Sequence, residues 1–305
     1  MRIGPASICK IFLIFLWNIS YHAEAANFSR LRPTRTNHTR RKIMSQSANA
    51  KDLLTNAANE GVISGLSIQA LNLVDIGGAI NAGLGTKVDL KTPEVLLNGL
   101  LMDDSGSIRF VAGNTEAVRQ GHNSVLDALG DSKQKNGIAV TCRYLNGTLL
   151  YEFSPLEQAI RMDTANFNPM GGTPLYDETL VMLGTVLAEQ QRYAEFGQVA
   201  RTATLIVSDG NDEHSRRAEA KDVAKVVRDM LRAETNIVAA MGIDDGKTKF
   251  RKVFGEMGIP DEWILTPGNT PSEIRKAFQV FSQSAVRASQ GGASFSQVAA
   301  GGFNA

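Results

Sequence analysis

The sequence predicts an α/β fold built on a mostly parallel sheet that helices cover on both faces. Between residues 93 and 288, apolar runs of strand length alternate with amphipathic helical patterns, and this alternation is typical of a parallel sheet. One hairpin signal, Asn146-Gly147, predicts a single antiparallel turn within it. A chain of 305 residues that is 43% hydrophobic has ample apolar material for a core, which excludes a wholly disordered protein.

Six apolar segments have the character of strands. The first lies between Pro93 and an Asp-Ser-Gly turn, and its unbroken apolar run indicates a buried strand. The next two flank the Asn-Gly turn. In chain order, the predicted strands are Val95–Met102, Ile138–Leu145, Thr148–Phe153, Thr202–Val207, Ile237–Ile243 and Trp263–Leu265.

Helical patterns lie between and after these strands. Asn114–Leu129 places its apolar side chains on one face and stops at Gly130. A long pattern over Pro174–Arg192 opens with Thr173-Pro174, a capping residue followed by proline at the first helical position. The other predicted helices are Ala218–Ala233, Lys249–Met257 and Ser272–Ala288.

Residues 1–43 form a basic head. They hold eight of the 32 Lys and Arg residues and one of the 31 acids, which leaves residues 44–305 with a net charge of −6. The head is interpreted either as a secretory signal ending at Ala23-Glu24-Ala25, which predicts export, or as an extension before a start at Met44, which favours a cytoplasmic protein. Its longest apolar run, Ile11–Trp17, is too short to span a membrane.

Two further segments flank the regular part of the chain. Residues 44–92 are Gly-rich, with a short helix expected over Lys51–Glu60, and Gly61–Leu90 is compatible with either a hairpin or a packed loop-and-helix element. Residues 289–305 carry no charge and are rich in Ala, Gly, Ser and Gln, so we expect a disordered tail unless Phe295 and Phe303 dock.

Charge and cysteine content exclude several classes of protein. The formal net charge of +1 gives no indication of a nucleic-acid partner. Two cysteines provide neither a disulfide scaffold nor a Cys-based zinc cluster. Cys142, inside a predicted strand, is expected to be a small buried hydrophobic residue.

Oxygen-bearing side chains follow the predicted strands. Asp103, Ser105 and Ser107 come after the first strand, Asp209 follows the strand Thr202–Val207, and Thr173 precedes the long helix. Because ligands gather at the carboxyl ends of parallel strands, we expect these residues to meet there. Carboxylates and hydroxyls suit Mg²⁺, Mn²⁺ or Ca²⁺ rather than zinc. Because so few carboxylates do not fully neutralise the cation, we expect it to keep bound water. An incoming carboxylate can displace that water.

Asp-x-Ser-x-Ser at Asp103, Ser105 and Ser107, Thr173 in Gly-Gly-Thr-Pro, and Asp209 in Ser-Asp-Gly resemble the metal-ion-dependent adhesion site (MIDAS) of von Willebrand factor type A (vWA, VWFA) domains, particularly stand-alone bacterial members. The resemblance covers residues 93–288. It implies a three-layer, Rossmann-like fold with a six-stranded sheet and Thr148–Phe153 as its antiparallel edge. It also implies that Ser105, Ser107 and Thr173 bind Mg²⁺ through their hydroxyls and that Asp103 and Asp209 bind it directly or through water. A Glu or Asp of a partner protein would complete the metal shell, and the domain would have no catalytic turnover.

Each of these residues also has a simpler interpretation. Asp103–Ser107 and Asp209-Gly210 are common turn sequences, and Thr173 is explained as a helix cap. Asp104, Asp212 and Glu213 are expected to be solvated acids at the rim, and His214 a surface residue. The conjunction of three loops at one sheet edge favours the metal site.

Two other functions compete with a binding module. The first is a Mg²⁺-dependent phosphohydrolase of the haloacid-dehalogenase type, which needs Asp-x-Asp; Ser105 stands at the second Asp and cannot act as a general acid at neutral pH. The second, which rests on the resemblance, is a non-catalytic subunit of a chelatase, ATPase or stress-resistance machine.

Overall fold

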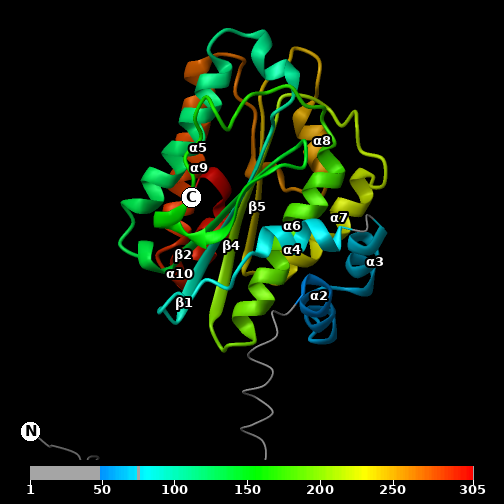
Figure 1. The fold of residues 1–305 in the computed structure, drawn as a ribbon, viewed down its shortest axis with the longest axis vertical. Helices are drawn as coiled ribbons and strands as arrows, with labels where there is room; N and C mark the ends of the chain where they lie inside the picture. Colours follow the sequence, from blue (N-terminus) through cyan, green and yellow to red (C-terminus); the bar gives the residue numbers. More distant parts are fainter. Residues whose placement is uncertain (1–48, 74–75, 305) are drawn as a thin grey trace, which may run out of the picture. The chain divides into compact units, whose positions relative to one another are not determined.

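The computed structural model describes residues 49–73 and 76–304. Within them, six strands form one sheet in the order β3-β2-β1-β4-β5-β6, and Figure 1 labels β2, β1, β4 and β5 of this sheet. Neighbouring strands are parallel except for β3, which lies antiparallel to β2 at one edge. The predicted α/β fold with one antiparallel edge strand is therefore confirmed. The strands are β1 Glu94–Met102, β2 Ile138–Tyr144, β3 Leu149–Pro155, β4 Val199–Ser208, β5 Asn236–Gly242 and β6 Ile264–Leu265.

The direction of the strand order reverses between β1 and β4. From β1 the chain moves outward to β2 and β3, and it then returns to β4 on the other side of β1. β1 and β4 pair in parallel with Leu101 opposite Ile206, so their carboxyl ends are adjacent. Ligands of open α/β sheets bind outside the carboxyl ends of the strands at such a reversal. The loops after Met102 and Ser208 therefore leave the sheet where the sequence predicts a site.

Helices cover both faces of the sheet, as Figure 1 shows. On one face, α5 (Asn114–Gly130) packs closely against α9 (Pro271–Ala288). Gly121 permits this approach, because a Cβ there would lie 2.0 Å from the Phe278 ring. On the other face, α6 (Leu175–Ala194) contacts β1 and β4, while α7 (Ala220–Arg232) and α8 (Phe250–Glu256) contact β5.

The Gly-rich flank forms an additional helical layer. It contains α2 (Ala50–Asn59), α3 (Gly65–Leu73) and α4 (Gly77–Leu84), which settles the alternative in favour of helices. α2 and α4 pack on α6, and α3 packs on α7. The Asp229 carboxylate of α7 fastens the start of α3 by accepting hydrogen bonds from Ser64 N (2.6 Å) and Ser67 Oγ (2.7 Å). The sheet and the flank helices enclose α6, and its Glu189 side chain is fully buried. Glu189 forms an ion pair with Arg192 of the same helix.

The C-terminal segment is folded, so the expectation of a disordered tail is wrong. After Gly291 turns the chain with a φ of 108°, α10 (Gly292–Gly301) packs against α9. Phe295 is fully buried, and the Phe303 ring meets Trp263 edge-on with centroids 4.9 Å apart. The two phenylalanines that offered the docking alternative anchor the segment, because the burial of large apolar side chains outweighs the low helix propensity of the glycines around them.

The basic head, with both of its interpretations, lies outside the described residues. Within residues 49–73 and 76–304, no helix combines the length and apolar character that crossing a bilayer requires.

Phe295→Ala tests whether the C-terminal helix is part of the fold. Removing a fully buried phenylalanine leaves a cavity, and we expect the free energy of unfolding to fall by about 3–5 kcal/mol. Urea denaturation of the full chain measures this loss. Gln297→Ala, at an exposed position of the same helix, should stay within about 0.5 kcal/mol of the parent. Equal stability of the two variants would contradict the docked position of α10.

Candidate metal centre

The Asp103 carboxylate joins the two loops that follow β1 and β4. It is fully buried directly after β1. Its Oδ1 accepts a hydrogen bond from Ser105 N (2.7 Å), and its Oδ2 accepts from Ser208 Oγ (3.0 Å) and Asp209 N (2.9 Å). The Asp103 side chain therefore fixes the conformation of the loop after β1 and holds that loop next to the loop after β4.

Three of the predicted ligand oxygens lie together. Ser105 Oγ is 2.8 Å from Ser107 Oγ and 3.0 Å from Asp209 Oδ1, and Ser107 Oγ is 2.7 Å from Asp209 Oδ1. Mg²⁺ binds oxygen at about 2.0–2.1 Å in octahedral geometry, which places adjacent ligands about 2.9 Å apart. The three oxygens are spaced like one face of such an octahedron, so the donor set and its geometry fit a hard divalent cation.

The loop that carries Thr173 is bound to the same edge of the sheet. Gly106 N donates to Gly171 O (3.1 Å), and Gly171 N donates to Asp104 O (3.0 Å). Thr173 is buried, and its N–H donates to His214 Nδ1 (2.9 Å). Among the described residues, the hydrogen bonds of Thr173 are made by its backbone, and none joins its hydroxyl to Ser105, Ser107 or Asp209. Thr173 stays a predicted ligand.

Thr173 does not cap the helix that follows it, contrary to the sequence interpretation. The residue before α6 is Pro174. The first N–H groups of the helix are satisfied from the β4 loop, where Ser215 Oγ accepts from Tyr176 N (3.1 Å) and Asp177 N (3.0 Å), and Asp212 Oδ1 accepts from Tyr176 N (3.2 Å). Because side chains distant in sequence perform the capping, the Thr173 hydroxyl is not used for it.

The acids expected at the rim differ in their surroundings. Glu213 is exposed. Asp104, however, is 3% exposed and accepts a hydrogen bond from Asn146 N (2.9 Å) in the β2–β3 turn, so its assignment as a solvated acid is wrong. Burial raises the pKa of Asp104 to about 6, and the nearby Asp103 carboxylate adds to the rise. Asp104 turns inward because the loop after β1 lies against that turn.

Sequence reasoning missed several supporting residues. Ser208, Ser215 and Asn146 each make a hydrogen bond that positions a loop of the site, and exposed His214 accepts the Thr173 N–H. Ser208 had a usable signal, because it ends a predicted strand immediately before Asp209. A Cβ on Gly172 would lie 2.8 Å from the His214 ring, so the second glycine of Gly-Gly-Thr-Pro makes room for this contact.

Two carboxylates provide the negative charge of the site. Burial, reinforced by the Asp103 carboxylate, raises the pKa of Asp209 to about 7. Within the described ranges, no cluster of three or more His, Cys, Asp or Glu side chains is placed to hold a metal. A cation at this centre would therefore depend on the serine hydroxyls and on water as well as on carboxylates, which favours Mg²⁺ over metals that need nitrogen or sulfur.

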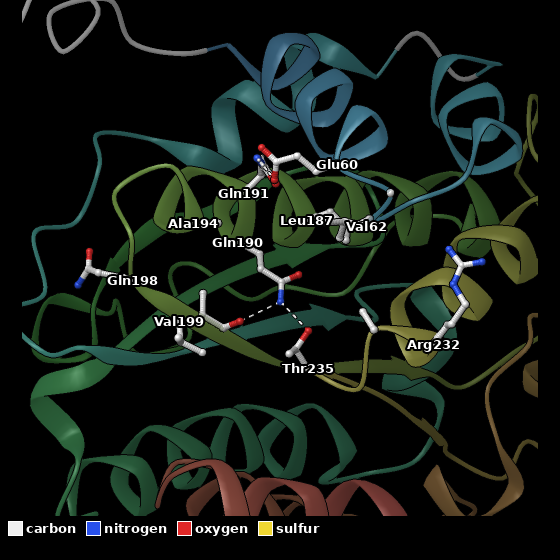
Figure 2. Close-up of a pocket in the computed structure, with 13 residues that line it drawn as sticks. Glu60, Val62, Leu187, Gln190, Gln191, Ala194, Gln198, Val199, Arg232 and Thr235 are labelled. Carbon is white, nitrogen blue, oxygen red and sulfur yellow. Dashed lines mark hydrogen bonds between the residues drawn. The ribbon is translucent and has the colours of Figure 1, made fainter. Parts of the chain in front are cut away.

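A hollow of about 470 Å³ lies away from these residues (Figure 2). It is next to Val199, at the start of β4, whereas Asp209 follows the end of that strand. Gln190 Nε2 donates across it to Ala200 O (2.9 Å) and Thr235 Oγ1 (3.1 Å). None of the predicted site residues lines this hollow.

No protein-family model matches the sequence, and no curated protein matches it. Among solved structures, mussel byssus proximal thread matrix protein 1 aligns with a TM-score of 0.45 and 13% identity over 63% of this chain and 46% of that one; one structure of it has a zinc-occupied MIDAS. A von Willebrand factor type A protein from Catenulispora acidiphila aligns with a TM-score of 0.41 and 16% identity over 64% of this chain and 43% of that one. The vWF domain of the type V pili tip protein Mfa5 from Porphyromonas gingivalis aligns with a TM-score of 0.44 and 11% identity over 65% of this chain and 97% of that one.

The chain thus spans less than half the length of the mussel and Catenulispora proteins. At identities of 11–16%, this likeness concerns the fold alone.

The raised pKa of Asp209 predicts a pH dependence of stability without metal. Its folded pKa of about 7 exceeds the ordinary value of 3.8, so the ionised carboxylate is disfavoured in the folded state. The free energy of unfolding should therefore fall as pH rises from about 4 to 7, by up to about 1.4 kcal/mol per pH unit, and level off above that range.

Urea denaturation between pH 4 and 8, with chelator present, isolates this contribution as the difference between the parent and Asp209→Asn. Exposed Asp131→Asn is the matched control for the loss of one charge. Identical pH slopes in the parent and Asp209→Asn would show that Asp209 titrates normally. Replacing the chelator with millimolar Mg²⁺ should raise the stability of the parent at pH 8 more than that of Asp209→Asn.

Proposed function

We propose that this protein is a divalent-cation-dependent protein-binding module, in which an acidic side chain of a partner completes the metal shell. The observation that carries the proposal is the group formed by Ser105 Oγ, Ser107 Oγ and Asp209 Oδ1. These oxygens come from two separate loops and lie within 2.7–3.0 Å of one another.

Ser105, Ser107 and Asp209 would hold the cation through these oxygens, with Thr173 as the expected further ligand. Both oxygens of Asp103 already accept hydrogen bonds from Ser105 N, Ser208 and Asp209 N. Asp103 would therefore act chiefly by holding the loops and through its charge. When bound, the cation supplies a coordination position that a carboxylate oxygen can take from water.

A binding role suits these side chains better than catalysis. Ser105 occupies the position where a phosphohydrolase of this architecture needs a carboxylic acid, and its hydroxyl is hydrogen-bonded to Ser107 and Asp209. A hydroxyl in this setting is a poor general acid at neutral pH. The proposed module therefore has no turnover of its own, and any catalysis would belong to its partner.

Calorimetric titration of Mg²⁺ and Mn²⁺ into the full chain tests the metal site. Ser107→Ala and Asp209→Asn each remove one of the grouped oxygens or its charge, so we expect the affinity to fall tenfold or more, about 1.4 kcal/mol. Thr173→Val removes a hydroxyl at constant shape and should weaken binding similarly if Thr173 is a ligand.

Glu213→Gln is the matched control, because Glu213 is an exposed acid on the Asp209 loop. Among the described residues, no hydrogen bond joins its side chain to the grouped oxygens. Its affinity should stay within about twofold of the parent, since exposed charges contribute little. Equal losses in Glu213→Gln and Asp209→Asn would indicate general electrostatic attraction in place of a coordination site.

A fluorescein-labelled Gly/Ser peptide with one central Glu tests the partner chemistry. Its anisotropy should rise with the protein in the presence of Mn²⁺ and return to the free value with EDTA. The same peptide with Gln lacks the metal-binding oxygen pair and should not bind. Equal binding of the Glu and Gln peptides, or binding indifferent to EDTA, would contradict the metal-bridged contact.

A further inference from the structure

A second hollow, of about 420 Å³, is lined partly by the chain segments that follow Asp209 and Thr173. It is lined by Tyr176, Asn211, Lys247, Thr248, Lys249, Lys252, Val253 and Glu256. Asn211 follows Asp209 by two residues and Tyr176 follows Thr173 by three, so two metal-site loops continue directly into its wall. Two residues of extended chain span at most about 7 Å, so the Asn211 side of the hollow lies within that distance of the Asp209 backbone.

The lining of the lysine hollow is basic in a region of the chain that is acidic overall. It contains three lysines and one glutamate, whereas residues 44–305 carry an excess of acids. Lys252 Nζ lies 3.7 Å from Glu256 Oε1 and forms an ion pair with it. In the described part of the chain, no carboxylate lies within ion-pairing distance of Lys247 or Lys249, and both side chains are exposed. Their charge is therefore available to an incoming group.

The acid nearest in sequence to these lysines serves the loop itself. Asp245 accepts hydrogen bonds from Lys247 N (2.8 Å), Thr248 N (2.6 Å) and Thr248 Oγ1 (2.7 Å). Asp212, next to Asn211 of the lining, accepts hydrogen bonds from Tyr176 N and from Ser215 Oγ. Both carboxylates thus have partners of their own, and the loop from β5 to α8 presents Lys247 and Lys249 in a fixed turn.

We infer that the lysine hollow binds a second carboxylate of the same partner, so that the module recognises an acidic segment by two anionic groups. One carboxylate would reach the cation held by Ser105, Ser107 and Asp209, and the other would lie among Lys247, Lys249 and Lys252. This inference rests on the proposed function, and it specifies the partner as a protein segment with paired acidic residues. The lysines add affinity and select against segments with a lone acid.

Labelled Gly/Ser peptides with one or two Glu residues measure this second contact. In the two-Glu series, the second Glu lies two, three or four residues after the first, which covers about 7–13 Å of extended chain. With Mn²⁺ and the full-length protein, at least one spacing should bind about fivefold more tightly than the one-Glu peptide. The gain should shrink in 0.5 M salt, because exposed charges are screened.

The decisive variant is Lys247→Gln/Lys249→Gln/Lys252→Gln. It should lose the gain from the second Glu while keeping the Mn²⁺ affinity and the one-Glu affinity of the parent. The matched control Lys51→Gln/Lys133→Gln/Lys135→Gln has the same change in net charge at exposed positions outside the hollow, and it should retain the gain. Circular dichroism and thermal unfolding verify that both variants fold.

The outcomes separate this inference from the function on which it rests. If no spacing improves on the one-Glu peptide, or if the gain survives in the lysine-hollow variant, the second subsite is refuted and the metal-bridged contact stands. If the one-Glu peptide shows no Mn²⁺-dependent binding at all, the proposed function fails, and the inference fails with it.

Discussion

The candidate site depends on the hydrogen bonds of one buried carboxylate. Asp103 accepts from Ser105 on its own loop and from Ser208 and Asp209 on the next. This arrangement is available only because β1 and β4 pair in parallel and end at the same level. Without Asp103, the N–H groups of Ser105 and Asp209 would lose their acceptor in a buried place, at a cost of roughly 1–3 kcal/mol for each, whereas the Ser208 hydroxyl could still donate to Gly210 O. The grouping of Ser105 Oγ and Ser107 Oγ with Asp209 Oδ1 depends on these hydrogen bonds, because they hold the two loops together.

The other loops are held by contacts that do not involve a metal. The Asn146 turn donates to Asp104, and Arg143 beside it forms a largely buried ion pair with Glu178 in the first turn of α6 (3.0 Å). At the opposite side of that helix start, Ser215 and Asp212 satisfy its free N–H groups. The position of α6 is fixed from a third side by the flank helices. Such support would preorganise the predicted ligand oxygens, which reduces the entropic cost of binding.

Charge is distributed to suit this arrangement. Burial raises the pKa values of Asp104 and Asp209, and the neighbouring Asp103 carboxylate adds to both rises. The lysine hollow is lined by Asn211 and Tyr176 from the segments that follow Asp209 and Thr173, and in the proposed function it receives a second acid of the partner. In the proposed function, one acidic segment carries both carboxylates, one for the lysines and one for the metal. A neutral or basic segment would meet repulsion or an unpaired charge at one of the two positions.

The sequence by itself determined the alternation of strands and helices, the antiparallel hairpin and the five candidate ligands, because apolar periodicity, the Asn-Gly turn and the loop motifs are local properties. Only the tertiary structure decided that Asp104 is buried, that Ser215 and Asp212 cap α6 in place of Thr173, and that the glycine-rich flank and the uncharged C-terminal segment are packed helices. Each of these outcomes depends on a surface supplied by residues far away in the chain. Local composition contains no information about such a surface, and the free energy of packing against it outweighs local propensity.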